Sequence, residues 1–163
     1  MCVRACVIGC GAAVCSRLEE SIRIVVHAHY AAPGVEESEI ARLVARLGFT
    51  LPDEVLAFYK RCNGARLFSW SDPVFDILPM SAIIGMGEFM YGSNGPECGP
   101  ASMVCFCGTG ERGGLALDLA SGPTYGEVRH CYPLMFPEDS ILVASGFCEF
   151  LWRAVNCGGE SWW

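Results

Sequence analysis

The chain has 163 residues, of which 52% are hydrophobic and 18% charged, a composition typical of one folded domain with an ordinary core. No apolar run reaches the roughly 18 residues of a membrane span, since Arg4 and Arg17 interrupt the apolar N-terminus. The net charge is −7, and residues 67–163 hold three Arg against eleven Asp or Glu. This field disfavours nucleic acid and favours a basic protein partner, although a solubilising acidic surface is the alternative interpretation.

Residues 1–30 form an apolar, Cys-rich N-terminal segment of unclear structure, in which Ser16 to Glu20 has the pattern of a helix start. Val7-Ile8-Gly9-Cys10 is similar to a lipoprotein cleavage box, but too little apolar sequence precedes Cys10 for export. The chain has eleven cysteines, an odd number, so we expect reduced thiols in a cytoplasmic protein rather than a disulfide framework. Cysteine then acts as a small buried apolar residue.

A helical hairpin is predicted next. After a turn at Ala31 to Gly34, residues 36–47 carry apolar side chains at three- and four-residue spacing, which predicts an amphipathic helix. Gly48 is placed to end this helix in a left-handed conformation. Pro52 opens a second helix that runs to about Cys62, and Asn63-Gly64 stops it.

In the second half of the chain the apolar pattern changes from helical to extended. Short strand candidates separated by turn residues predict an antiparallel sheet. Gly85 to Pro100 is rich in Gly and Pro and is predicted as a long exposed loop. A helix with Phe147, Phe150 and Leu151 on one face closes the domain. The strand candidates are Leu67–Trp70, Phe75–Leu78, Met103–Cys107, Gly114–Leu119, Gly126–Tyr132 and Ile141–Ala144.

This order of elements predicts an α+β fold, with helices packed on one face of an antiparallel sheet, an N-terminal helical hairpin and a closing C-terminal helix. We expect one domain over residues 31–157 and a tail over residues 158–163.

No catalytic, nucleotide-binding or metalloprotease motif occurs, so we expect no enzyme, no cofactor and no catalytic residue. His130 is interpreted as a hydrogen-bonded or exposed strand residue. Cys105 and Cys107 are expected on one strand face, and Cys2, Cys6 and Cys10 recur at helical spacing, but no pair has the two-residue separation typical of zinc sites. We therefore expect no metal, and a metal- or thiol-dependent protein is the alternative.

Two groups of residues are candidates for partner contact. Trp162-Trp163 would be costly to leave in water, so the pair either folds back on the domain or meets a partner. The acidic candidates lie on or beside predicted turns and the long loop, where exposure is expected. The aromatic candidates are Trp70, Tyr91, Trp162 and Trp163, and the acidic ones are Asp72, Glu88 and Glu111.

Four segments over about residues 36–155 resemble the SUKH superfamily. They are Ile40 to Gly48 continuing through Leu51-Pro52-Asp53 to Phe58-Tyr59; Asn63-Gly64; Ile77-Leu78-Pro79-Met80; and Ala144 to Leu151. Two departures from the family pattern are Cys131, where an acidic residue is more usual, and the additional Gly146.

The resemblance implies a helix-on-sheet binding scaffold without catalytic residues. The founding SUKH members are yeast cell-wall synthesis regulators, and most bacterial members are immunity proteins against polymorphic toxins. The resemblance therefore implies a protein partner, in bacteria often a nuclease toxin, whose basic active site suits an acidic inhibitor. A regulatory scaffold like the yeast members is the alternative.

Overall fold

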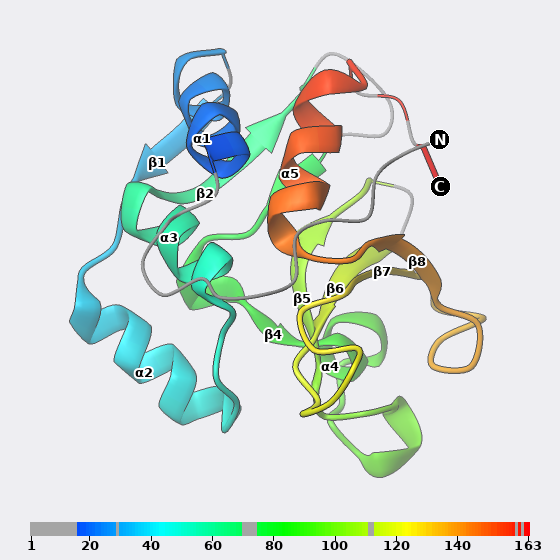
Figure 1. Ribbon diagram of the computed structural model, residues 1–163. Coiled ribbons are helices and arrows are strands. Elements are labelled where there is room, and N and C mark those ends of the chain that lie inside the picture. The colour runs from blue at the N-terminus through cyan, green and yellow to red at the C-terminus, as the bar shows by residue number, and fades with distance from the viewer. Residues whose placement is uncertain (1–15, 29, 70–74, 111–112, 159, 161) are drawn as a thin grey trace.

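The computed structural model describes residues 16–28, 30–69, 75–110, 113–158, 160 and 162–163, which form an α+β domain (Figure 1). Its sheet has eight strands, all paired antiparallel, in the order β1-β2-β3-β5-β6-β7-β8, and β4 pairs with β5. The strands are β1 Tyr30–Pro33, β2 Cys62–Leu67, β3 Phe75–Ile77, β4 Ile84–Gly85, β5 Met103–Gly108, β6 Gly114–Asp118, β7 Val128–Cys131 and β8 Ile141–Ala144.

The helices lie where the predicted fold class needs them. Helices α2 and α3 precede most of the sheet and α5 closes the chain, which confirms the α+β prediction. In the described part of the chain, none of the helices is long and apolar enough to cross a membrane. The helices are α1 Ser16–Ala28, α2 Glu37–Leu47, α3 Asp53–Arg61, α4 Met86–Tyr91 and α5 Phe147–Asn156, with 3-10 turns η1 Met80–Ala82 and η2 Pro96–Cys98.

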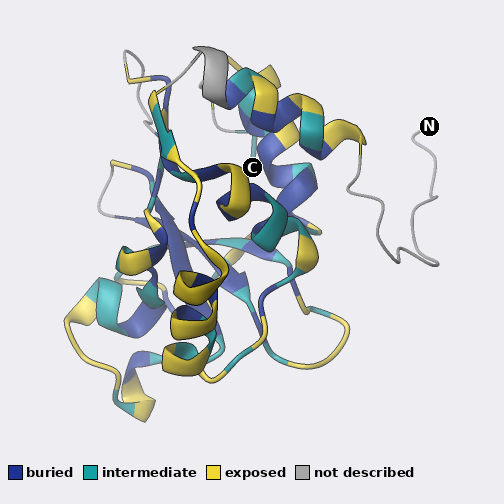
Figure 2. Ribbon diagram, turned by 90° about the vertical axis from the view of Figure 1, so that its left-hand side faces the viewer, coloured by how far each residue is buried: buried dark blue, intermediate teal, exposed yellow. Residues whose placement is uncertain are grey.

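The main core lies between one face of the sheet and the helices α1, α3 and α5. Its centre is a set of edge-to-face aromatic contacts. The ring centroids of Phe58 in α3 and Phe147 in α5 lie 5.1 Å apart. Those of Phe106 in β5 and Phe150 in α5 lie 5.3 Å apart. Helix α1 joins this core through buried side chains, including Leu18 and Val25. Buried residues gather on the sheet and on the inner sides of these helices (Figure 2).

A second, smaller core lies on the opposite face of the sheet, under α4 and the segment that follows β7. Neighbouring residues of β5 supply both cores, because Val104 belongs to the main one and Met103 and Cys105 to the smaller one. The buried members of the smaller core are Met86, Met103, Cys105, Ala116, Cys131 and Phe136.

The prediction that Cys105 and Cys107 share a strand face is wrong. The register between β5 and β6 shifts between these two residues, which indicates a β-bulge at Phe106. Phe106 and Cys107 therefore both belong to the main core, whereas Cys105 belongs to the smaller one.

Asn63-Gly64 does not stop a helix, because α3 has already ended at Arg61 and the pair lies within β2. The Asn63 Oδ1 atom accepts a hydrogen bond from the backbone N–H of Met80 at 2.7 Å. Gly64 has a φ of +85°, and a Cβ atom there would lie 2.7 Å from the carbonyl oxygen of Ile77. The pair thus fixes the close approach of β2 to the end of β3.

Two segments predicted as irregular contain regular structure. The expected turn at residues 31–34 is mostly β1, whose residues pair with β2. The expected loop over residues 85–100 holds the end of β4, helix α4 and η2. Residues 91–94 at its tip are exposed as predicted, and so are Pro96, Glu97 and Pro100. Met86 is fully buried, so this stretch covers the smaller core instead of extending into solvent. Gly48, in contrast, ends α2 with a φ of 75°, as predicted.

Candidate protein-binding surface

Two of the predicted contact residues, Glu88 and Tyr91, lie on α4, three positions apart and so on the same side of the helix. The helix can lie close to η2 because Gly87 has no side chain. A Cβ atom at this position would lie 2.6 Å from the Cys98 carbonyl oxygen. On the inner side of α4, the fully buried Met86 side chain packs in the smaller core. Helix α4 therefore presents half-buried Glu88 and exposed Tyr91 at the molecular surface.

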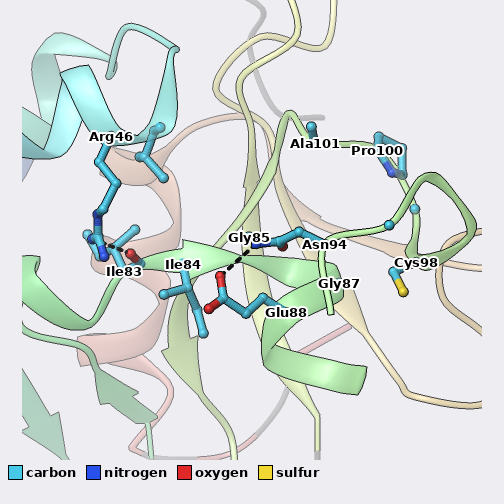
Figure 3. Close-up of a pocket in the computed structure, with 13 residues that line it drawn as sticks. Arg46, Ile83, Ile84, Gly85, Gly87, Glu88, Asn94, Cys98, Pro100 and Ala101 are labelled. Atoms are coloured by element: carbon cyan, nitrogen blue, oxygen red, sulfur yellow. Dashed lines mark hydrogen bonds between the residues drawn. The ribbon is translucent and has the colours of Figure 1, made fainter. Parts of the chain in front are cut away.

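A cleft of about 260 Å³ separates α2 from the segment around α4 (Figure 3). On one side the Arg46 guanidinium donates a hydrogen bond to the Ile83 carbonyl oxygen at 2.6 Å. On the other side the Asn94 amide donates to the Glu88 carboxylate at 2.9 Å. Among the described residues that line the cleft, Cys98 is the one thiol and there is no His, so no nucleophile lies beside a histidine base there. The cleft thus offers polar contacts rather than a catalytic pair.

Tyr91 connects α4 to the loop that joins β7 and β8. Its hydroxyl lies 2.5 Å from the carbonyl oxygen of Pro133 and 2.8 Å from that of Phe136, and its single proton can be donated to either. The residue as a whole is 44% exposed. Tyr91 therefore fixes this loop from one end and remains available to a partner from its ring face.

Trp162 and Trp163 fold back on the domain and are half-buried against the main core. The Trp162 indole N–H donates to the Val143 carbonyl oxygen at 3.3 Å, and the Trp163 indole N–H donates to His130 Nδ1 at 2.8 Å. Both rings lie about 6 Å from the ring of Phe75. Of the two arrangements expected for this pair, the structure has the folded-back one, and contact with a partner stays a prediction.

The predicted contact residues do not form one continuous site. Helix α4 with Glu88 and Tyr91 covers the smaller core, whereas Trp162 and Trp163 pack on the main core, on the other face of the sheet. The remaining three, Trp70, Asp72 and Glu111, lie outside the residues that the structure describes.

The β7–β8 hairpin carries a group of exposed apolar side chains that was not predicted from the sequence. Leu134 is 99% exposed, and Met135, Ile141 and Leu142 are 41–51% exposed. The available signal was Pro133-Leu134-Met135 in a connection between two strands, where large apolar residues have no core to enter.

The acidic character of the second half of the chain is only partly neutralised by ion pairs. Arg129 pairs with Glu127 at 3.2 Å, and Arg153 pairs with Glu149. Within the described ranges, no ion pair engages the remaining acids of this half apart from Asp76, which pairs with Arg66. The described acids of this half without an ion-pair partner among the described residues are Glu88, Glu97, Asp118, Glu138, Asp139 and Glu160.

The described cysteines are buried, except for half-buried Cys157. Burial raises the pKa of the Cys62, Cys105 and Cys131 thiols to about 12, so they stay protonated at neutral pH. A protonated thiol is a weak nucleophile and a poor metal ligand. In the part of the chain that the structure describes, no three His, Cys, Asp or Glu side chains gather as a metal site would need. Cys2, Cys6 and Cys10 lie outside that part.

The family of the chain can be identified by comparison with known proteins. Residues 34–153 match the model of the SMI1 / KNR4 family (SUKH-1), a range that runs from just before α2 into α5 and includes α4 and the β7–β8 hairpin. No curated protein matches the chain.

Proposed function

The chain belongs to the SMI1 / KNR4 family (SUKH-1), and from this premise we propose that it is a non-enzymatic domain that binds and neutralises a basic, nuclease-type toxin domain. The observation that carries the proposal is the set of carboxylates in the second half of the chain that have no described ion-pair partner. A nuclease binds phosphates through a basic face, and an acidic surface is complementary to it.

Neutralisation would follow from occupying that basic face. Unpaired carboxylates raise the rate of encounter with a basic protein, and contacts at close range then decide how long the complex lasts. Glu88, half-buried at the cleft, is suited to the electrostatic encounter. Tyr91, exposed beside the cleft, is suited to the close-range contacts that slow dissociation. Asp72 and Glu111 are proposed to add to the same field.

The chemistry of the cysteines argues against the thiol-dependent alternative. Cys105 and Cys131 are fully buried in the smaller core, and their raised pKa values keep the thiolate concentration low at neutral pH. A regulatory scaffold like the yeast members would use the same surface with a different partner, and inhibition of a toxin separates it from the proposed role.

Charge reversal tests the electrostatic part of the proposal. The probe is a purified nuclease-type toxin domain from the same organism, and the variant changes Asp72, Glu88 and Glu111 to Lys. We expect slower association and a flatter dependence of the association rate on salt, with little change in dissociation, as measured by stopped-flow fluorescence.

The matched control changes Glu20, Glu36 and Glu39 to Lys, three exposed acids of the first half of the chain. It alters the net charge by the same amount. Equal slowing by both variants would show that total charge and not this face steers the toxin domain, and unchanged association of the first variant at low salt would leave the acidic surface a solubilising role alone.

A further inference from the structure

The β7–β8 hairpin concentrates exposed apolar surface that the packing of the domain does not use. Eight large apolar or aromatic side chains are exposed in the described part of the chain, and four of them fall within residues 134–142. At 99% exposure the Leu134 side chain buries almost nothing within its own chain. It therefore contributes almost no hydrophobic stabilisation to the fold, whereas a complex that buried it would gain the transfer free energy of the whole Leu134 side chain.

The loop that carries Leu134 and Met135 is held by its own backbone. The N–H groups of Met135 and Phe136 donate to the Tyr132 carbonyl oxygen at 3.0 and 2.8 Å, and Asp139 N–H donates to the Met135 carbonyl oxygen at 2.8 Å. Phe136 is 4% exposed and anchors the loop in the smaller core, while the Tyr91 hydroxyl contacts two of its carbonyl groups. A loop ordered before binding loses less conformational entropy on association.

The charges beside this loop indicate what kind of partner fits. Glu138 and Asp139 follow it, are exposed, and form no ion pair with a described residue. Arg129, the basic residue of β7, is already paired with Glu127 and donates to the Ser140 carbonyl oxygen. Two copies of this hairpin would bring like charges together, so a second copy of the chain is disfavoured and a basic protein is favoured.

The exposed edge of β8 is less suited to binding by strand addition. The β7–β8 register shifts at Val143, which interrupts a regular edge, and the Trp162 indole already uses the Val143 carbonyl oxygen. Side chains of the loop, rather than backbone groups of β8, are therefore the available contacts.

We propose that Leu134 and Met135 form the apolar anchor of the partner interface and insert into an apolar pocket bordered by Lys or Arg. Tyr91 holds the loop through the contacts of its hydroxyl with two loop carbonyl groups. Glu138 and Asp139 pair with the Lys or Arg side chains that border the partner's pocket. This inference rests on the proposed function, because it names the surface through which the basic toxin domain is bound. A central apolar anchor with a charged rim is the arrangement that concentrates binding energy in few residues.

The test replaces Leu134 and Met135 with Ser and measures the dissociation constant and the dissociation rate for a purified nuclease-type toxin domain from the same organism by surface plasmon resonance. We expect the dissociation constant to rise at least about tenfold through faster dissociation, since buried anchors act mainly on the off-rate. The control is Tyr30→Ser on β1, at the opposite edge of the sheet, where an 81% exposed side chain is lost and affinity is expected to change less than about twofold.

Thermal unfolding of both variants should match that of the parent chain, because exposed residues contribute little to stability. An unchanged dissociation constant in the Leu134/Met135 variant would overturn this inference while leaving the proposed function intact. Absence of binding by the parent chain would overturn both. A dimer of the parent chain in sedimentation analysis that the variant abolishes would instead assign the loop to self-association.

Discussion

The hydrogen bond between Trp163 and His130 makes a definite prediction about the stability of the domain at low pH. An indole N–H can only donate, so His130 Nδ1 must accept and the ring must be neutral, with its proton on Nε2 near Thr109 Oγ1 at 3.5 Å. His130 is 3% exposed. Burial lowers its pKa from 6.5 to about 4, which means that the folded protein resists protonation over a range in which the unfolded chain does not.

The sign follows from proton uptake. Between pH 6.5 and about 4 the unfolded chain binds a proton at His130 that the folded protein excludes, so the free energy of unfolding falls as the pH is lowered through this window. Above pH 6.5 the folded protein has the full stabilisation that comes from keeping His130 neutral. With these two pKa values it amounts to up to about 3 kcal/mol, of which about 2 kcal/mol is lost between about pH 7 and about pH 5.

The assay is urea unfolding at about pH 7 and about pH 5, comparing the parent chain with His130→Gln, whose amide can still accept from Trp163 without titrating. Carboxylates titrate equally in both proteins, so the difference between their pH dependences isolates His130. Equal losses in the two proteins would show that His130 does not cause the pH dependence. An NMR titration of His130 in the folded parent chain provides the same test if the variant is unstable, and a pKa near its ordinary value would contradict the account.

Three further predictions concern the fold and the cysteines. Gly64→Ala should destabilise the domain by more than about 2 kcal/mol, because its Cβ would collide with Ile77, whereas Gly48→Ala, also at positive φ but with open space around it, should lose about 1 kcal/mol; equal losses in urea unfolding would remove the steric explanation. Deleting the residues before Ser16 should preserve a cooperative thermal transition, whereas deleting through Ala28 should abolish it, because α1 fills part of the main core; loss of the transition in the shorter deletion would place the first Cys residues in the core as well. Elemental analysis of the reduced protein should find no stoichiometric zinc or iron, and one metal per chain with unfolding on chelation would contradict the assignment of cysteine as core filler.

The elements with a strong local pattern were predictable from the sequence. The apolar spacing through Ile40 and Leu43 placed α2, and Gly48 placed its end, because both signals depend on neighbours within one or two turns. The strands around Phe106 and Leu115 were found from short apolar runs between turn residues. The same locality explains why the α+β class could be predicted.

Features that depend on distant residues were not predictable. Asn63-Gly64 has the same local signature whether it stops a helix or kinks a strand, and its actual role depends on Met80, 17 residues later. Similarly, nothing local to Met86 reveals that the smaller core needs a cover on that side of the sheet. The bulge that separates Cys105 from Cys107 arises from pairing with β6.

Residues of the candidate binding surface differ in the same way. Glu88 and Tyr91 could be selected because charged and aromatic residues in a Gly-rich stretch are usually accessible. Leu134 and Met135 had a weaker signal, their place between the two predicted strands, and their exposure became definite only with the fold, which puts their loop beyond the ends of β7 and β8.

Whether this chain neutralises a nuclease-type toxin by binding it can be measured by titrating a purified nuclease-type toxin domain from the same organism with the purified chain and following DNA or RNA cleavage. The account predicts that cleavage falls in proportion to the chain added and is abolished at an equimolar amount, with the protection weakened by added salt. Cleavage that continues unchanged in a large excess of the folded chain would contradict it.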